Sequence, residues 1–340
     1  MTEKRNALFS ALSAVFISLL FCFLLGELGA RLWTASHPVY DVEMWKYAKL
    51  LKKKLDDPVL RYGHLQGDAD LMGVRLRING KGLRGREYPY EKSDRSFRIL
   101  VLGDSLTLGW GVNQEQTYPS LLEQELNRQS GRGKYEVINA GVGNWNTVQE
   151  VKFYWEEGYK YKPDLVILGY CINDAETEER YRNHGFLFRH SCLLVLFWSR
   201  WNNFAVRFGW RKDYLKYYRD LYQGGESAGW SKTRSALLGL AEYNMNEGIG
   251  TLVLLLPELH QPGKYYPFRN IHELLLRTGR ELGVPVLDTL NFFAGISPQR
   301  LWVAPDDTHP NALAHEIIAG AVLKNPSFLK YLEQEQRRKN

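Results

Sequence analysis

Cysteine is scarce in this chain, which has three cysteines among 340 residues. They are too few and too scattered for a disulfide framework, although one bridge between Cys171 and Cys192 stays open and Cys22 lies in an apolar run. No Cys-x-x-Cys occurs, and His309 and His315 do not have the spacing of metal ligands. The sequence therefore predicts neither a metal site nor an organic cofactor.

A strong excess of charge of one sign is also absent. The net charge is +6 at pH 7, and the basic residues are scattered among acidic ones without interleaved aromatics. This pattern argues against a nucleic-acid partner, while a modest basic balance suits anionic lipid. With 44% apolar and 24% charged residues, the chain can form one domain of about 200 to 250 residues plus extra segments.

Charge is missing altogether from residues 7–26, a run long enough for about 30 Å of helix. Lys4 and Arg5 precede it, and Arg31 is the one basic residue in the next fifteen. We expect residues 1–30 to be a single transmembrane anchor in a bacterial inner (cytoplasmic) membrane, with the rest of the chain periplasmic or extracytoplasmic. A cleavable signal peptide is the alternative.

Residues 31–94 carry patterns too short for a core of their own, and we expect a linker with a small β-hairpin. Apolar and basic residues alternate from Val74, and the pattern predicts a turn at Asn79-Gly80. One interpretation is a solvated ribbon that leads into the first core strand. In the other, Arg84 or Arg86 leans towards an active site to meet an anionic substrate.

Five short apolar runs alternate with helical patterns in the rest of the chain. Such alternation predicts an α/β domain in which helices cover both faces of a mostly parallel sheet. The runs are Phe97–Leu102, Tyr135–Asn139, Asp164–Gly169, Thr251–Leu256 and Val284–Leu287.

Ser105 follows the first of these runs directly after Gly103-Asp104. The pattern predicts a buried strand that delivers a hydroxyl to its carboxyl end, where open α/β sheets keep their sites. A serine at such a place is also a common helix N-cap. As a nucleophile it needs a base within hydrogen-bond reach and a third group that orients the base.

The segment Asp306-Asp-Thr-His309-Pro-Asn311 supplies both groups. An acid three residues before a histidine can bend back within a turn and bind Nδ1, which leaves Nε2 for Ser105. Asp307 is the competing acid. A turn whose acids cap the following helix is the structural alternative.

Two further blocks lie between the serine and the histidine, Asn139-Ala-Gly-Val-Gly-Asn144 and Gly169-Tyr-Cys-Ile-Asn173-Asp174. With these four blocks in this order, residues 95–325 resemble the SGNH/GDSL hydrolase family. The resemblance implies a three-layer α/β/α sandwich, in which the five apolar runs form a five-stranded sheet. The charged residues near the C-terminus separately predict a solvated helical tail over residues 326–340. It also implies a serine that attacks ester carbonyls.

The family pattern Asp-x-x-His selects Asp306 as the acid that orients His309. The resemblance further implies three oxyanion donors, namely the backbone amides of Ser105 and Asn144 and the side-chain amide of Asn173. Asn144 stands where the family usually has glycine, and asparagine tolerates the left-handed backbone better than other residues with a side chain. Capping of the next helix by Asn173-Asp174 is the alternative.

Aromatic residues are dense between Cys192 and Trp210, where Trp198, Trp201, Phe204 and Phe208 accompany Arg200 and Arg207. Too few uncharged residues run together to span a bilayer. The segment is either an ordinary helical pair packed on the domain or an amphipathic lid or membrane-facing surface.

Together these features predict a membrane-anchored serine esterase that acts through Ser105, His309 and Asp306 by way of an acyl-enzyme. Its expected substrate is an O-acylated saccharide or lipid of the cell envelope. One alternative is an O-acetyltransferase of surface polysaccharide that works with an integral-membrane acyl donor. Another is an inactive module of the same fold that serves assembly or binding.

Overall fold

The computed structural model describes residues 2–94, 96–130, 135–176, 185–208, 214–223 and 228–339. The chain divides into two compact units. The smaller comprises Met1–Lys46 and Arg182–Arg211, and the larger comprises Tyr47–Tyr181 and Lys212–Asn340. Ser105, His309 and the proposed oxyanion residues all belong to the larger unit.

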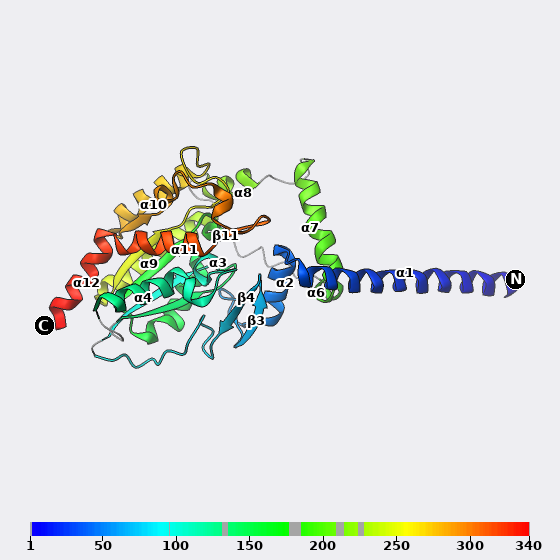
Figure 1. The fold of residues 1–340 in the computed structure, drawn as a ribbon, viewed down its shortest axis with the longest axis horizontal. Coiled ribbons are helices and arrows are strands. Elements are labelled where there is room, and N and C mark those ends of the chain that lie inside the picture. Colours follow the sequence, from blue (N-terminus) through cyan, green and yellow to red (C-terminus); the bar gives the residue numbers. More distant parts are fainter. Residues whose placement is uncertain are drawn as a thin grey trace. The chain divides into compact units, whose positions relative to one another are not determined.

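A five-stranded parallel sheet forms the centre of the larger unit (Figure 1). Its strand order is β6-β5-β7-β8-β9, and every neighbouring pair is parallel. Each apolar run singled out in the sequence forms one of these strands, so the predicted sheet is confirmed. The strands are β5 (Phe97–Gly103), β6 (Tyr135–Gly141), β7 (Leu165–Tyr170), β8 (Gly250–Leu255) and β9 (Val286–Asp288).

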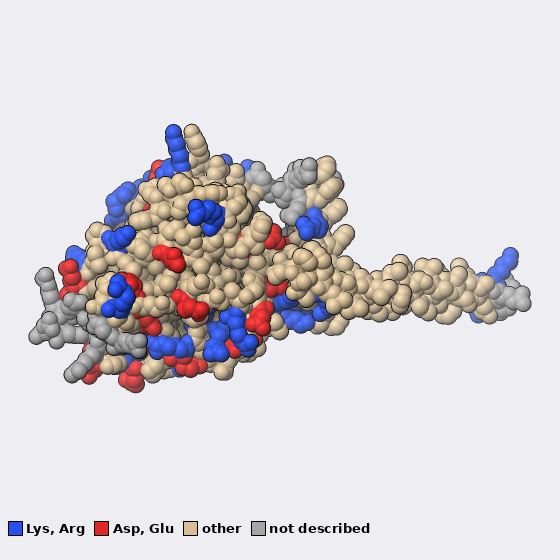
Figure 2. Space-filling model, viewed as in Figure 1, with Lys and Arg blue, Asp and Glu red and all other residues tan. Residues whose placement is uncertain are grey.

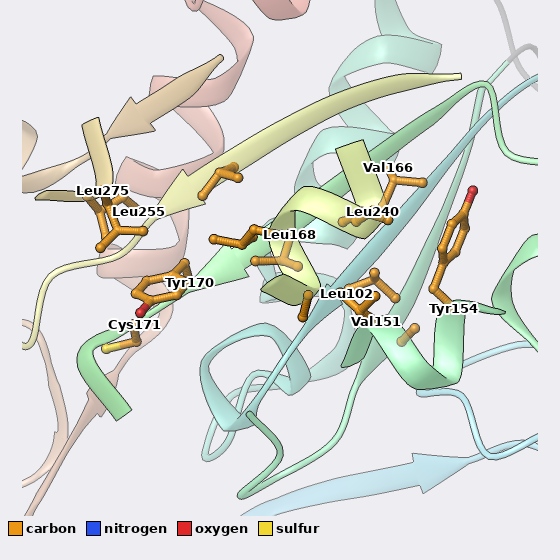
Figure 3. Packing of buried hydrophobic residues seen from close by; sticks show 14 of the residues in the cluster. Leu102, Val151, Tyr154, Val166, Leu168, Tyr170, Cys171, Leu240, Leu255 and Leu275 are labelled. Atoms are coloured by element: carbon orange, nitrogen blue, oxygen red, sulfur yellow. The ribbon is translucent and has the colours of Figure 1, made fainter. Parts of the chain in front are cut away.

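Helices cover both faces of this sheet, because its strands are apolar on both sides. In β5, Leu100 and Leu102 enter the core on one face, and Ile99 and Val101 enter the core on the other (Figure 3 shows the first). The first face packs on α5 (Thr147–Glu156), α9 (Ala228–Asn246) and α10 (Arg269–Leu282), and the second on α4 (Tyr118–Ser130), α11 (Ala312–Leu323) and α12 (Pro326–Lys339). The three-layer α/β/α architecture is therefore confirmed.

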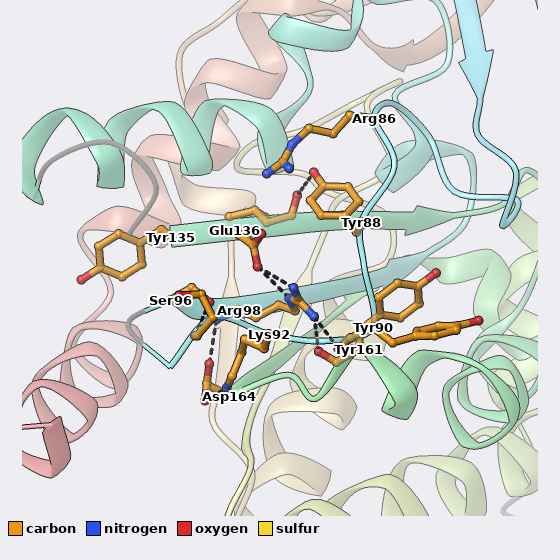
Figure 4. Close-up of polar contacts among 12 residues, drawn as sticks. Arg86, Tyr88, Tyr90, Lys92, Ser96, Arg98, Tyr135, Glu136, Tyr161 and Asp164 are labelled. Atoms are coloured by element: carbon orange, nitrogen blue, oxygen red, sulfur yellow. Dashed lines mark hydrogen bonds and ion pairs between the residues drawn. The ribbon is translucent and has the colours of Figure 1, made fainter.

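A polar cluster fixes the amino ends of the strands, at the edge opposite Ser105 (Figure 4). The fully buried Arg98 pairs with Glu136 at 2.7 Å and donates to the carbonyl of Tyr161 at 2.6 Å. Its own backbone N–H donates to Asp164, which also pairs with Lys92. Because every charge in the cluster has an opposite partner, the buried guanidinium is compensated.

Two hairpins precede the sheet, and one corrects the prediction from sequence. Strand β4 (Val74–Ile78) pairs with the preceding β3 (Gly67–Leu71), so the main turn is at Met72-Gly73 and not at Asn79-Gly80. After Asn79-Gly80 the chain does reverse, but it forms a single bridge, Ile78 to Arg84. The other hairpin joins β1 (Lys52–Lys54) to β2 (Tyr62–His64).

Short helices complete the larger unit. Among them are the 3-10 helices η1 (Gln114–Gln116), η2 (Gly158–Tyr161), η5 (Leu290–Phe293) and η6 (Pro298–Arg300), and the α-helix α8 (Tyr214–Tyr222).

Helix α1 (Thr2–Ser36) dominates the smaller unit. Its segment Lys4–Ser36 has a mean hydropathy of 2.6 in its most apolar window, none of which is buried. Figure 2 shows no charged surface along most of this helix. It is long and apolar enough to cross a membrane, and a signal sequence has the same properties.

Helix α7 (Cys192–Arg207) packs against α1 within this unit. The Glu27 carboxylate of α1 accepts hydrogen bonds from Ser191 Oγ at 2.7 Å and from the backbone N–H groups of Cys192 and Leu193 at 3.0 and 2.9 Å. A carboxylate is favoured at this place because the first N–H groups of a helix lack partners. The unit also holds α6 (Phe186–His190) and the start of α2 (Tyr40–Leu50).

Helix α7 has two contrasting faces. Cys192, Val195 and Ala205 are buried, whereas Phe197, Trp201, Phe204 and the adjacent Phe208 are exposed at spacings of four, three and four residues. The helix is therefore amphipathic in an unusual sense, since its exposed face is aromatic. Trp210 and the side chains of Val206 and Arg207 lie outside the described residues. All three cysteines are free thiols, so the bridge left open between Cys171 and Cys192 is not formed.

Candidate active site

Ser105 is the first residue of the short helix α3 (Ser105–Leu108), directly after β5. Gly103, which joins the strand to the turn, has φ of 156°, and a Cβ there would lie 2.0 Å from Thr107 Oγ1. Asp104 caps the helix through a hydrogen bond from the Leu106 N–H at 2.8 Å. The Gly-Asp-Ser sequence therefore makes a sharp strand-to-helix turn that carries Ser105 at the carboxyl edge of the sheet.

His309 reaches Ser105 from the other end of the domain. It lies on β11 (Asp307–Pro310), which pairs with β10 (Trp302–Ala304) in a two-stranded ribbon just before α11. His309 Nε2 is 2.8 Å from Ser105 Oγ. The structure thus brings the predicted nucleophile and base within hydrogen-bond reach, as general-base activation of an alcohol requires.

The acid beside His309 differs from the expectation. His309 Nδ1 lies 2.5 Å from an oxygen of Asp307, the competing candidate, whereas Asp306 is exposed in the turn between β10 and β11. The physical reason is that residues 307–310 form a strand instead of the turn assumed from sequence. In an extended strand residues two apart project to the same face, and residues three apart do not.

Trp110 holds the second oxygen of Asp307, through a hydrogen bond from its indole Nε1 at 2.8 Å. Asp307 is only 2% exposed, and burial alone would raise its pKa. The hydrogen bonds from His309 and Trp110 outweigh burial, so the pKa lies below its ordinary value. A carboxylate against Nδ1 fixes the tautomer in which Nε2 accepts the Ser105 proton.

The three groups predicted as oxyanion donors lie at the carboxyl ends of β5, β6 and β7. Among the described residues, the backbone N–H groups of Ser105 and Asn144 donate to no protein acceptor. The Asn173 side-chain amide donates one of its two hydrogens to Asp104 at 2.7 Å, and the other hydrogen has no acceptor in the described part of the chain. Serine hydrolases aim such donors at the developing charge.

Asn144 occupies the third position of a turn closed by the Trp145 N–H donating to the Val142 carbonyl at 3.1 Å. Its φ of 67° is left-handed, as the third position of a type II turn requires. The Val142 N–H donates to the Gly103 carbonyl at 3.0 Å, which ties this turn to the end of β5. The asparagine thus adopts the backbone geometry for which glycine is usual.

Asn173 and Asp174 have separate roles in the 3-10 helix η3 (Ile172–Ala175). Asp174 accepts hydrogen bonds from the Cys171 N–H and from Thr147 Oγ1, so its side chain takes part in the capping box of η3, whose N-cap is Cys171, and Asn173 donates to Asp104. Burial raises the pKa values of Asp104 and Asp174. The capping alternative therefore holds for Asp174 but not for Asn173.

Arg84 is not available to a substrate. It is 1% exposed, and its guanidinium donates to the carbonyls of Leu108, Gly109 and Val112, the last two at 2.5 Å. The interpretation that placed it at an active-site mouth is wrong for this residue, because its donors hold the loop after α3. Arg86 lies at the surface beside Glu123 and over the Tyr88 ring.

His315 lies in the same region but has a structural role. It is fully buried, and its Nδ1 accepts from the Tyr118 N–H at 3.1 Å, which requires the neutral form. Burial lowers its pKa to about 3. Among the described residues no three His, Cys, Asp or Glu side chains are grouped as metal ligands would be.

Comparison with known proteins identifies the domain. The model of the GDSL-like Lipase/Acylhydrolase family matches residues 101–317. An uncharacterized protein of Mycoplasma pneumoniae is 28% identical over 166 residues, which is 44% of this chain but 19% of that protein, so the match spans about a fifth of the relative.

Several solved structures resemble this chain at low sequence identity. The TesA structure gives a TM-score of 0.45 at 17% identity, over 69% of this chain and 99% of that one. The acetylxylan esterase Axe2 of Geobacillus stearothermophilus gives a TM-score of 0.43 at 20% identity, over 68% of this chain and 95% of the esterase chain. A two-domain esterase (CEX) active on acetylated mannans gives a TM-score of 0.44 at 17% identity, over 69% of this chain and 49% of the esterase chain.

Proposed function

The chain belongs to the GDSL-like lipase/acylhydrolase family, and from this premise we propose that it is an ester-hydrolysing enzyme whose nucleophile is Ser105. One observation carries the proposal. Ser105, His309 and Asp307 form a continuous chain of contacts. Ser105 Oγ is 2.8 Å from His309 Nε2, and His309 Nδ1 is 2.5 Å from Asp307 Oδ1. This is the arrangement that converts a weak nucleophile into a strong one near neutral pH.

The reaction then has two halves. His309 Nε2 removes the Ser105 proton while Oγ attacks the ester carbonyl carbon, and Asp307 stabilises the imidazolium that results. His309 next gives the proton to the leaving alcohol oxygen as the carbon–oxygen bond breaks, which leaves an acyl-serine. Water attacks this acyl group by the same proton route and releases the carboxylic acid together with free Ser105.

The N–H groups of Ser105, Asn144 and Asn173 would receive the charge of each tetrahedral intermediate. Their support is that each has a hydrogen with no protein acceptor in the described part of the chain. A donor aimed in advance at the oxyanion typically contributes about 3 kcal/mol to transition-state stabilisation.

The proposed substrate is an O-acyl ester of an envelope saccharide or lipid. The support is helix α1, which is long and apolar enough to keep the larger unit beside a membrane. Transfer to a sugar hydroxyl in place of water, with an integral-membrane partner as acyl donor, would use the same residues. An inactive module is disfavoured because nucleophile, base and acid are in contact.

We place α1 as a retained anchor in a bacterial cytoplasmic membrane, with the larger unit outside. Lys4 and Arg5 before the apolar run, against Arg31 shortly after it, support this orientation. Alkaline phosphatase fused to the C-terminus should be active. A fluorescent protein that matures only in the cytoplasm should not fluoresce when it is fused at the same place. The opposite pair of results would contradict the orientation.

The exposed aromatic face of α7 supports a second contact with that membrane, since such side chains favour the interface. An environment-sensitive dye at Phe197→Cys, in a Cys22→Ser background reconstituted in bilayers, should report an apolar site. The same dye at Met245→Cys, an exposed position on α9 of the larger unit, is the control and should report water. Equal spectra at the two positions would argue against the contact.

The catalytic proposal is tested on the full chain in detergent with a fluorophosphonate label and with p-nitrophenyl acetate and butyrate. Wild type should label and turn over, and Ser105→Ala should lose both. Labelling with turnover only when a sugar acceptor is present would assign a transferase. A folded wild-type protein that neither labels nor turns over would contradict the nucleophile.

A further inference from the structure

The turn that carries Asn144 receives unusual support from a distant part of the sequence. The Asn144 side chain is exposed and its backbone is left-handed, so the turn is a poor candidate for stability by its own sequence. The backbone polar groups of Gly143 and the Asn144 carbonyl are hydrogen-bonded by Tyr47, Lys52 and Tyr62, which lie on α2, β1 and β2. These three residues precede the stretch of 101–317 that the family model matches.

Lys52 makes the most specific of these contacts. Its ammonium Nζ donates to the Gly143 carbonyl at 2.6 Å and to Asn144 Oδ1 at 2.9 Å. The same ammonium lies 4.8 Å from the centre of the Tyr47 ring and 4.3 Å from that of Tyr62. Two carbonyl oxygens and two ring faces thus surround one cation, which holds it in a defined place. Burial there lowers the pKa of Lys52 to about 7.

Tyr47 also hydrogen-bonds to the turn, at the Gly143 N–H. Its hydroxyl accepts from the Gly143 N–H at 3.0 Å and lies 2.6 Å from His64 Nε2. The Gly82 carbonyl, 2.8 Å from His64 Nδ1, can only accept, so Nδ1 carries the proton and Nε2 accepts from Tyr47. Burial lowers the pKa of His64 to about 3, which keeps it in this neutral form.

Tyr62 makes a further hydrogen bond to the turn, and the lack of a side chain at Gly143 lets Tyr47 pack closely on it. The Tyr62 hydroxyl donates to the Asn144 carbonyl at 2.6 Å. A Cβ on Gly143 would lie 2.8 Å from Tyr47 Cε1, closer than real contacts allow, so the tyrosine ring packs directly on the turn backbone. The N–H and carbonyl of Gly143 and both oxygens of Asn144 are therefore all engaged, and among the described residues the Asn144 N–H alone in this turn segment has no protein acceptor.

We propose that Lys52, assisted by Tyr47 and Tyr62, is a positioning residue that fixes the backbone N–H of Asn144 as an oxyanion donor. The inference rests on the proposed function, since it assumes that Ser105 attacks a carbonyl. It assigns a role in the chemistry to a segment outside the region that the family shares. An oxyanion donor acts only if held in place before the reaction, and a small misplacement costs rate without loss of binding.

The test compares Lys52→Met, Lys52→Arg and Lys53→Met with wild type, as full chains in detergent, by kcat and KM for p-nitrophenyl acetate. Lys53 is the matched control, because it is the exposed neighbour on the same strand. Lys52→Met should lower kcat about 10- to 100-fold while KM changes less than about threefold. Lys52→Arg should recover most of kcat, and Lys53→Met should match wild type.

The outcomes separate this inference from the proposal it rests on. If wild type itself neither turns over nor labels with fluorophosphonate, the proposed function fails. If wild type is active and a folded Lys52→Met keeps its kcat, or loses affinity in place of kcat, the positioning role is wrong. Should Lys52→Met not fold, Tyr62→Phe removes a single hydroxyl and should lower kcat about three- to tenfold; an unchanged kcat would overturn the inference.

Discussion

Trp110 and His309 hold opposite oxygens of one buried carboxylate, that of Asp307. The centroids of the two rings are 6.3 Å apart, and the acid is hydrogen-bonded to both the indole and the imidazole. Because both oxygens of Asp307 accept hydrogen bonds, its charge is retained in a buried place where it would otherwise be costly. This arrangement, and not the spacing of acids along the sequence, decides which aspartate serves the histidine.

Asp307→Asn should therefore remove most of the activity. An amide can present a donor to Nδ1 and so favours the wrong imidazole tautomer, and we expect kcat to fall about 10³- to 10⁴-fold. Asp306→Asn is the matched control and should stay within about threefold of wild type. The measurement is kcat on p-nitrophenyl acetate, and a larger loss in the Asp306 variant would reverse the assignment.

Trp110→Phe tests the outer hydrogen bond of the same acid. The change keeps an aromatic ring but leaves one oxygen of the buried carboxylate without its donor, which typically costs about 1 to 3 kcal/mol. We expect kcat to fall about tenfold while the protein stays folded. Steady-state kinetics beside a melting curve measure both effects; a variant with full activity would show that His309 alone is enough to hold Asp307.

Glu150→Gln tests a buried carboxyl that the chemistry does not use. Glu150 is 1% exposed, neither of its oxygens has a partner among the described residues, and burial raises its pKa well above the ordinary value. Above about pH 4.5 the unfolded chain loses this proton while the folded protein keeps it, so folding becomes less favourable as pH rises.

The variant lacks this ionisation, so its stability relative to wild type should grow between pH 4.5 and 8, by at most about 1.4 kcal/mol per pH unit. Denaturant unfolding of both proteins at several pH values measures the difference. Burial also raises the pKa values of Asp104 and Asp174, whose charges act on Glu150, so the difference reports the linked titration of these three carboxyl groups. A difference that does not change with pH would contradict the raised pKa.

Arg84→Lys should destabilise the loop behind the nucleophile. Lysine has one donor group in place of a planar fork and cannot reach three carbonyls at once, so we expect a loss of about 2 to 4 kcal/mol in the free energy of unfolding. Arg86→Lys, at an exposed position, should change it by less than about 0.5 kcal/mol. Equal effects of the two changes in denaturant unfolding would count against the loop-holding role.

The sheet was predictable because its strands are buried on both faces, and a parallel strand such as Ile99 to Leu102 is then apolar at every position. The hairpin turn was not, because Met72 carries no turn preference although it adopts φ of 50° before Gly73. Asn79-Gly80, which has that preference, closes only a single bridge.

In the site, Ser105 and His309 follow from motifs, but the contacts around them depend on tertiary structure. The choice between adjacent acids required knowing that Asp307 lies on a strand. Trp110 offered a faint signal, as an aromatic residue between two glycines shortly after the serine. Lys52 offered none, because three consecutive lysines resemble a solvated surface until the rings of Tyr47 and Tyr62 enclose the first of them.

The separation of 204 positions in sequence between Ser105 and His309 has a consequence for synthesis. A chain that leaves the ribosome from its N-terminus presents the serine long before β11 exists, and a free hydroxyl without its base is inert towards esters. A truncated product that ends before residue 307 lacks acid and base together. Under the proposed mechanism, nascent and prematurely terminated chains are therefore inactive, and ester cleavage begins only when the last part of the domain has been made.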